Sequence, residues 1–260
     1  MQKIVPSTLS ADGLLRLTCP RSWKEMNEEQ LRYALHIIGC GQCSHEEGRT
    51  RMLLHFTGIR IERNTMRGWL CTIPVVSPNG KRRHHTFFLQ AWQVQDMIRQ
   101  LEYVDSYETF DVRLESIQGH MAVDPLLHGV RFHDYLQMEK YYQIFLERLM
   151  PDMALKLAQM LYPGGVTAID EAELTNCIMW YSYVKKRMQR FFPHFFRPAP
   201  VGNGKSVNFY EQMNAQIRAL TDGDITKEQA VYDKDCWRAL TELDAKAREA
   251  EDFRKKFPKT

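Results

Sequence analysis

The spacing of apolar residues changes part-way along this chain, and this change limits the folds open to it. From residue 132 onward apolar side chains recur every three or four positions, as Leu174, Ile178 and Tyr181 do. That spacing is typical of amphipathic helices. Runs typical of strands lie earlier in the chain, at residues 59–63, 69–76 and 86–90. We therefore expect an α+β fold, with a small N-terminal α/β part that contains a β-hairpin and a mostly α-helical C-terminal part.

Local signals place several elements of the N-terminal part. Asn27 and Gln30 have the spacing of a capping box, which predicts a helix that starts at this point and ends near Gly39. A second short helix is expected to stop at Gly58. The turn-forming residues 77–80 join two strands of the hairpin, and the alternation over residues 111–115 indicates a further strand.

The C-terminal part begins near Asp124 and Pro125, so we expect domains at residues 1–122 and 123–260. Pro151 is expected at the first position of a helix, and residues 198–204 form the best linker in the chain. A long terminal helix is predicted at about residues 226–254, with Thr226 and Gln229 as its capping box. We expect this helix to dock on its neighbours; the weaker alternative is a partner-binding face made by Trp237, Leu240, Leu243 and Ala247.

Composition excludes several classes of protein. The chain has 260 residues, 44% of them hydrophobic, and a formal net charge of +3, which is ordinary for a globular protein and unlike a disordered one. No apolar run reaches the length of a membrane span, and the first residues do not have the pattern of a signal peptide. The six cysteines are too sparse for a disulfide scaffold, so we expect a reducing interior.

One short pattern resembles part of a metal site. Cys40 and Cys43 are two residues apart, and His45 follows them, so two thiolates and an imidazole could approach one zinc ion. A zinc module normally has a second pair of ligands, which this chain lacks at a matching spacing. We therefore expect ordinary loop cysteines and no bound metal, with zinc as the weaker alternative.

A basic and aromatic stretch raises the question of nucleic acid. It contains Lys185, Lys186, Arg187, Arg190, Phe191 and Phe195. The cations could neutralise phosphates while the rings stack on bases. Because the aromatics continue the apolar stripe of the preceding helix, we expect them to pack in the core, and nucleic-acid binding remains the alternative.

The motifs of several common enzymes are absent from the sequence. It has no Gly-x-Ser-x-Gly elbow, no His-Glu-x-x-His pair and no Gly-x-Gly-x-x-Gly loop. We therefore expect a protein that is not an enzyme, with no catalytic residues and no cofactor.

Landmarks spread along the chain carry a family resemblance. The most distinctive are MNAQIRALTDGDITK at residues 213–227 and DCWRALTELDAKAREA at residues 235–250; others lie at residues 5–13, 19–23, 30–35, 92–98, 123–129 and 135–141. With these the chain resembles an uncharacterised protein family that recurs in prophages of gut Bacteroidetes. Residues 40–45 depart from that family pattern.

The resemblance implies a phage origin and a place among tail-morphogenesis genes. We therefore expect an assembly chaperone or a minor virion component that acts by protein–protein contacts. Its partners would be other phage structural or tail proteins, with self-association left open and no contact with membranes. Its location would be the cytoplasm of the bacterial host during assembly, or the virion itself.

Overall fold

The computed structural model describes residues 8–9, 15–76, 82–197 and 209–257. Contacts divide the chain into an N-terminal unit, Met1–Leu114 with Asp170–Asn176, and a C-terminal unit, Glu115–Ile169 with Cys177–Thr260. The division falls at Leu114 rather than at the expected residue 122, and a distant segment joins the first unit. A buried hydrogen bond of 2.9 Å from the Leu114 amide to Asn176 Oδ1 explains why that segment belongs there.

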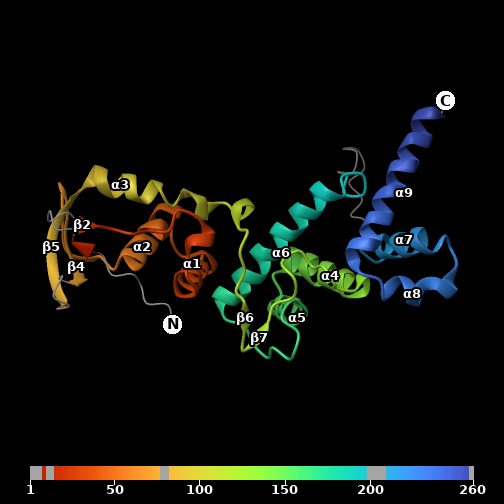
Figure 1. Ribbon diagram of the computed structural model, residues 1–260, viewed down its shortest axis with the longest axis horizontal. Coiled ribbons are helices and arrows are strands. Elements are labelled where there is room, and N and C mark those ends of the chain that lie inside the picture. Colours follow the sequence, from red (N-terminus) through yellow and green to blue (C-terminus); the bar gives the residue numbers. More distant parts are fainter. Residues whose placement is uncertain (1–7, 10–14, 77–81, 198–208, 258–260) are drawn as a thin grey trace. The chain divides into compact units, whose positions relative to one another are not determined.

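Helices precede and follow a small sheet in the N-terminal unit, and with the helical C-terminal unit they confirm the expected α+β fold (Figure 1). In chain order its elements are β1 (Thr8–Leu9), β2 (Leu15–Arg16), α1 (Glu28–Cys40), α2 (His45–Thr57), β3 (Arg60–Thr65), β4 (Gly68–Val76), β5 (Arg82–Gln90) and α3 (Ala91–Arg99). The capping box of Asn27 and Gln30 is confirmed, because each side chain accepts a hydrogen bond from the other residue's backbone N–H. Gly58 ends α2 with a left-handed backbone, as expected.

The sheet has the order β3–β4–β5 and is antiparallel throughout. Strands β4 and β5 pair without interruption from Gly68 opposite Gln90 to Val76 opposite Arg82. Alternate residues of β4, namely Cys71, Ile73 and Val75, are buried, so one face of the sheet covers the core. The expected turn at residues 77–80 lies outside the described residues.

The expected strand at residues 111–115 is wrong. A short 3-10 helix, Tyr107–Thr109, precedes this segment, and the structure assigns residues 111–114 to no strand. Phe110 and Leu114 are buried, which accounts for the apolar alternation. The segment is not a strand because the Leu114 amide bonds to the Asn176 side chain rather than to a neighbouring strand.

The C-terminal unit is helical apart from one small hairpin. Its elements are β6 (Ser116–Ile117), β7 (His120–Met121), α4 (Phe132–Arg148), α5 (Pro151–Leu161), α6 (Glu171–Phe191, from Cys177 onward), α7 (Phe209–Thr221), α8 (Glu228–Tyr232) and α9 (Cys236–Lys256). Pro151 occupies the first turn of α5, as expected. The helices α7, α8 and α9 lie together (Figure 1). The expected linker at residues 198–204 lies outside the described residues.

The expected single helix over residues 226–254 is wrong in its first part. A 3-10 turn, Ile225–Lys227, and the short helix α8 occupy this region before α9 begins at Cys236. Asp224, and not Thr226, caps the first turn, since its side chain accepts from the Thr226 amide. The break has a tertiary cause: the Lys234 carbonyl accepts from the Phe132 amide, and the Cys236 amide donates to the Val130 carbonyl. These groups are therefore used outside the helix.

Gly39 allows α1 to lie very close to the first turn of α6. A Cβ atom at this position would overlap the Thr175 hydroxyl oxygen and lie 3.1 Å from the Glu171 carbonyl oxygen. The Thr175 hydroxyl donates to that same carbonyl at 2.6 Å, so it has little freedom to move away. The absence of a side chain at residue 39 thus sets the distance between the two segments of the N-terminal unit.

Asp235 joins the loop before α4 to the start of α9. One carboxylate oxygen caps α9 by accepting from the Trp237 and Arg238 amides at 2.9 and 3.2 Å. The other accepts from the Gly129 amide at 2.6 Å. Trp237 adds a further link, because its indole Nε1 donates to the Leu126 carbonyl at 2.7 Å. One acidic side chain therefore serves both as a helix cap and as a tertiary contact.

We predict that Gly39→Ala lowers the free energy of unfolding by about 1–3 kcal/mol, because the added methyl has no room. Denaturation followed by circular dichroism measures the change. The matched control is Gly48→Ala in α2, where the new Cβ would lie 3.3 Å from the Ile37 Cγ2 methyl and would overlap no atom. There the gain in helix propensity offsets the tighter contact. Equal losses in the two variants would contradict this explanation.

We also predict that Asp235→Ala costs about 2–4 kcal/mol of stability, because it removes the cap and the charged hydrogen bond together. Asp235→Asn keeps an acceptor for the cap but presents an N–H₂ group to the Gly129 amide, so its cost should be intermediate. Denaturant midpoints of both variants test this order. Asp233→Asn, the same change at an exposed neighbour, should alter stability by less than about 0.5 kcal/mol.

Candidate functional site

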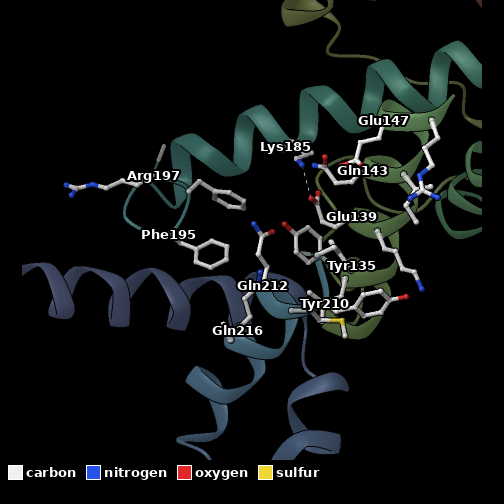
Figure 2. Close-up of a pocket in the computed structure, with 18 residues that line it drawn as sticks. Tyr135, Glu139, Gln143, Glu147, Lys185, Phe195, Arg197, Tyr210, Gln212 and Gln216 are labelled. Atoms are coloured by element: carbon white, nitrogen blue, oxygen red, sulfur yellow. Dashed lines mark hydrogen bonds and ion pairs between the residues drawn. The ribbon is translucent and has the colours of Figure 1, made fainter. Parts of the chain in front are cut away.

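An open groove in the C-terminal unit is a candidate site among the residues that the structure describes. Its volume is about 890 Å³, and α4, the end of α6 and α7 form its walls (Figure 2). Its lining residues are Tyr135, Leu136, Glu139, Lys140, Gln143, Ile144, Glu147, Arg148, Lys185, Phe195, Phe196, Arg197, Phe209, Tyr210, Gln212, Met213, Ala215 and Gln216. Its size lies within the range of about 300–1,000 Å³ common for ligand sites.

Two parallel rows of side chains on α4 form one wall. Tyr135, Glu139, Gln143 and Glu147 follow one another at intervals of four, and Leu136, Lys140, Ile144 and Arg148 do the same. Residues four apart lie on the same face of a helix, so both rows face the groove. Figure 2 shows Gln212 of α7 directed from the opposite wall into the same space.

Glu139 holds α4 to α6 at the side of the groove. Lys185 Nζ donates to Glu139 Oε2 at 2.7 Å, and the Tyr181 hydroxyl donates to Oε1 at 2.9 Å. Burial raises the pKa of the Tyr181 phenol well above its ordinary value, and the nearby Glu139 charge raises it further, so the phenol stays a donor. Lys185 also lies over the Tyr142 ring, 5.2 Å from its centroid. Both oxygens of the carboxylate are thus engaged in helix packing.

Other lining residues make fewer contacts within the protein. Gln216 Oε1 is buried and has no hydrogen-bond partner among the described residues. A buried acceptor in this state costs about 1–3 kcal/mol. Tyr210 is 54% exposed, with the Lys140 ammonium 5.2 Å from its ring centroid. The groove therefore offers an aromatic surface and basic groups to a bound molecule.

The structure separates the residues of the basic and aromatic stretch. Lys185 and Phe195 line the groove, whereas Arg187 lies over the ring of Phe191, 5.1 Å from its centroid. Phe191 in turn meets the edge of Trp237 at a centroid distance of 5.2 Å. Arg190 is exposed and Lys186 is half-buried. Lys185 therefore faces α4, away from Lys186, Arg187, Arg190 and Phe191. The expected packing of the aromatics in the core is wrong for Phe191, which is 47% exposed.

The residues of the candidate partner-binding face lie mostly inside the unit. Leu240 and Leu243 are buried in its core, and Ala247 is half-buried. Trp237 is half-buried, stacked on His128 at a centroid distance of 4.3 Å. This arrangement agrees with the expected docking of the terminal helix on its neighbours.

The three candidate metal ligands do not meet in one place. Cys40 lies beside His36 and Glu171, which sequence reasoning did not include. His45 instead pairs with Asp105, whose Oδ1 lies 3.2 Å from His45 Nδ1. Cys43 and His45 line a smaller pocket of about 320 Å³. Val104 and Asp105, from the short 3-10 helix that follows α3, line the same pocket.

Sequence reasoning also missed the groove. The row from Tyr135 to Glu147 reads as polar positions on the solvent side of a helix, and only the arrival of α7 makes that face a wall. The spacing of four was the available signal.

Comparison with models of protein families, with curated proteins and with solved structures finds no match to this chain. None of the helices among the described residues is both long enough and apolar enough to cross a lipid bilayer.

We predict that Lys185→Met destabilises the C-terminal unit by about 2–4 kcal/mol. The Lys185 and Glu139 side chains are only 18% and 14% exposed, so the variant leaves a poorly solvated carboxylate without its cation. Adding Glu139→Gln should return part of the loss, and a double-mutant cycle measures that coupling. Lys227→Met is the control, because its ion pair with Asp224 is exposed and should contribute less than about 1 kcal/mol. Strictly additive effects of the two groove variants would contradict the prediction.

Proposed function

We propose that this protein is a non-enzymatic binding protein of phage tail morphogenesis, and that its groove holds an acidic, amphipathic helix of a partner protein. The observation that carries the proposal is the groove between α4, α6 and α7, which combines basic, aromatic and methionine side chains. The phage setting rests on the family resemblance of the sequence.

The charges of the lining favour an acidic partner. The groove is lined by the cations Lys140, Arg148, Lys185 and Arg197 and by the carboxylates of Glu139 and Glu147. Lys185 neutralises Glu139, and Arg197 pairs with Glu251 at 2.9 Å. Among the described residues Lys140, Arg148 and Glu147 have no ion-pair partner, so the lining keeps a net positive charge after these pairs are counted. Lys140 and Arg148 lie two turns apart on α4. Carboxylates two turns apart along one edge of a bound helix could pair with these two cations.

The apolar part of the lining favours a partner helix that has one apolar face. Ile144 of α4, Phe196 after α6, and Tyr210 and Met213 of α7 line the groove. Methionine and aromatic side chains adapt to differently shaped partners. Recognition of a helix in such a groove needs anchors at intervals of three and four residues, which an amphipathic segment supplies. An assembly chaperone that shields such a segment would use the groove in this way.

Photo-crosslinking inside cells tests the proposal. A photoreactive amino acid replaces Gln212 in the groove or, as a control, the exposed Glu242 outside it, in bacteria whose prophage is induced. We expect position 212, and not 242, to crosslink to a tail protein through an acidic amphipathic segment identified by mass spectrometry. Crosslinks to nucleic acid, or none specific to position 212, would contradict the proposal.

The mapped segment, made as a peptide, allows a quantitative test. Lys140→Glu with Arg148→Glu should weaken its binding at least about tenfold, equivalent to roughly 1.4 kcal/mol, because attraction becomes repulsion. Lys156→Glu with Lys227→Glu makes the same change of charge at exposed positions outside the groove and should leave the affinity unchanged. If both pairs of substitutions weakened binding equally, the effect would come from net charge alone, and the result would contradict the proposed site.

A further inference from the structure

Three side chains with metal-ligand chemistry meet in the N-terminal unit. His36 and Cys40 are four residues apart on α1 and therefore lie on the same face of that helix. Glu171 comes from the first turn of α6, in the segment that joins this unit from a distance. One ligand atom from each lies within 4.8 Å of the other two.

The distances among these atoms have the size of the edges of a coordination shell. Cys40 Sγ lies 3.7 Å from His36 Nδ1 and 2.8 Å from Glu171 Oε2, and His36 Nδ1 lies 3.3 Å from the same oxygen. A circle through the three atoms has a radius of about 1.9 Å, slightly less than Zn–N and Zn–O bonds of about 2.0–2.2 Å and a Zn–S bond of about 2.3 Å. An ion placed just above the plane of the atoms would thus reach all three without a change of backbone.

The surrounding contacts hold the first turn of α6, which carries Glu171, beside α1. Asp170 and Glu173 cap the start of α6 by accepting from each other's amides at 2.8 and 3.1 Å, and Arg32 of α1 donates to Glu173 at 3.1 Å. Glu173 is thereby occupied, which leaves Glu171 as the carboxylate that faces His36 and Cys40. Gly39 sits between these two residues and permits the close approach of the helices.

We propose that His36, Cys40 and Glu171 bind a zinc-class divalent cation. Thiolate and imidazole ligands select zinc and related transition metals over magnesium or calcium. His36 and Glu171 have side chains that are 53% and 59% exposed, so solvent reaches the site and water completes the coordination. The bound ion would tie α1 to a segment that lies 131 residues further along the chain.

Binding exchanges a proton for the metal. In the metal-free protein the Cys40 thiol donates to Glu171 Oε2 at 2.8 Å. The ion takes the place of this proton: the S–H bond breaks, the sulfur keeps the electron pair and donates it to the metal, and the proton passes to solvent. No oxidation state changes.

Cobalt(II) is a suitable probe, because a thiolate bound to it gives a charge-transfer absorption band and a tetrahedral site gives strong visible bands. The full chain, reduced and freed of metal, is titrated with cobalt, and zinc is then added in competition. We expect one equivalent to bind and zinc to displace it. Cys40→Ser should remove the thiolate band, and His36→Gln or Glu171→Gln should weaken binding more than about 100-fold, beyond the usual loss for outer-sphere changes.

Cys43→Ser and His45→Gln serve as matched controls, because they remove the other metal-type residues of the same region, which are not members of the cluster. Both should leave stoichiometry and affinity unchanged. Circular dichroism of each metal-free variant shows that it is folded, and zinc should raise the melting temperature of the unaltered chain but not of Glu171→Gln. The absence of a thiolate band at a large excess of cobalt would overturn the proposal, and so would binding that needs Cys43 but not Glu171.

Discussion

The link that Asp235 makes between the loop before α4 and the start of α9 is the contact on which the C-terminal unit depends. Its carboxylate caps α9 and also accepts from the Gly129 amide, while backbone bonds join Phe132 to Lys234 and Cys236 to Val130. Helix α7 packs on α9, so the position of α7 follows from this link. The groove exists because α7 is held opposite α4.

Glu139 gives the groove its fixed wall. A carboxylate that is only 14% exposed must have its charge balanced and its oxygens bonded, and Lys185 and Tyr181 meet both requirements. These two bonds join α4 to α6, whereas on the α7 side Gln216 Oε1 is buried without a hydrogen-bond partner among the described residues. Our proposal assigns recognition to this second side, together with Lys140, Arg148 and the aromatic residues. The metal site that we propose lies in the other unit and does not depend on the function proposed for the groove.

Predictions from local chemistry were accurate where the structure depends on residues close in sequence. The capping box at Asn27, the end of α2 at Gly58 and the start of α5 at Pro151 are confirmed, since each depends on one turn of backbone. The strand at residues 111–115 and the single helix over residues 226–254 were wrong for one shared reason. In both, backbone groups bond to a partner distant in the chain: Asn176 for Leu114, and Phe132 for Lys234.

The candidate sites divide in the same way. The sequence by itself determined the α+β composition, most helix ends and the neighbours on one helix face, such as His36 with Cys40 or Tyr135 with Glu139, because a period of 3.6 residues is a local property. Only the tertiary structure brought Glu171 to Cys40 and α7 to α4. It also placed Cys43 and His45 apart from Cys40, although they are close in sequence. Side chains from distant segments meet only through packing, which no local spacing encodes.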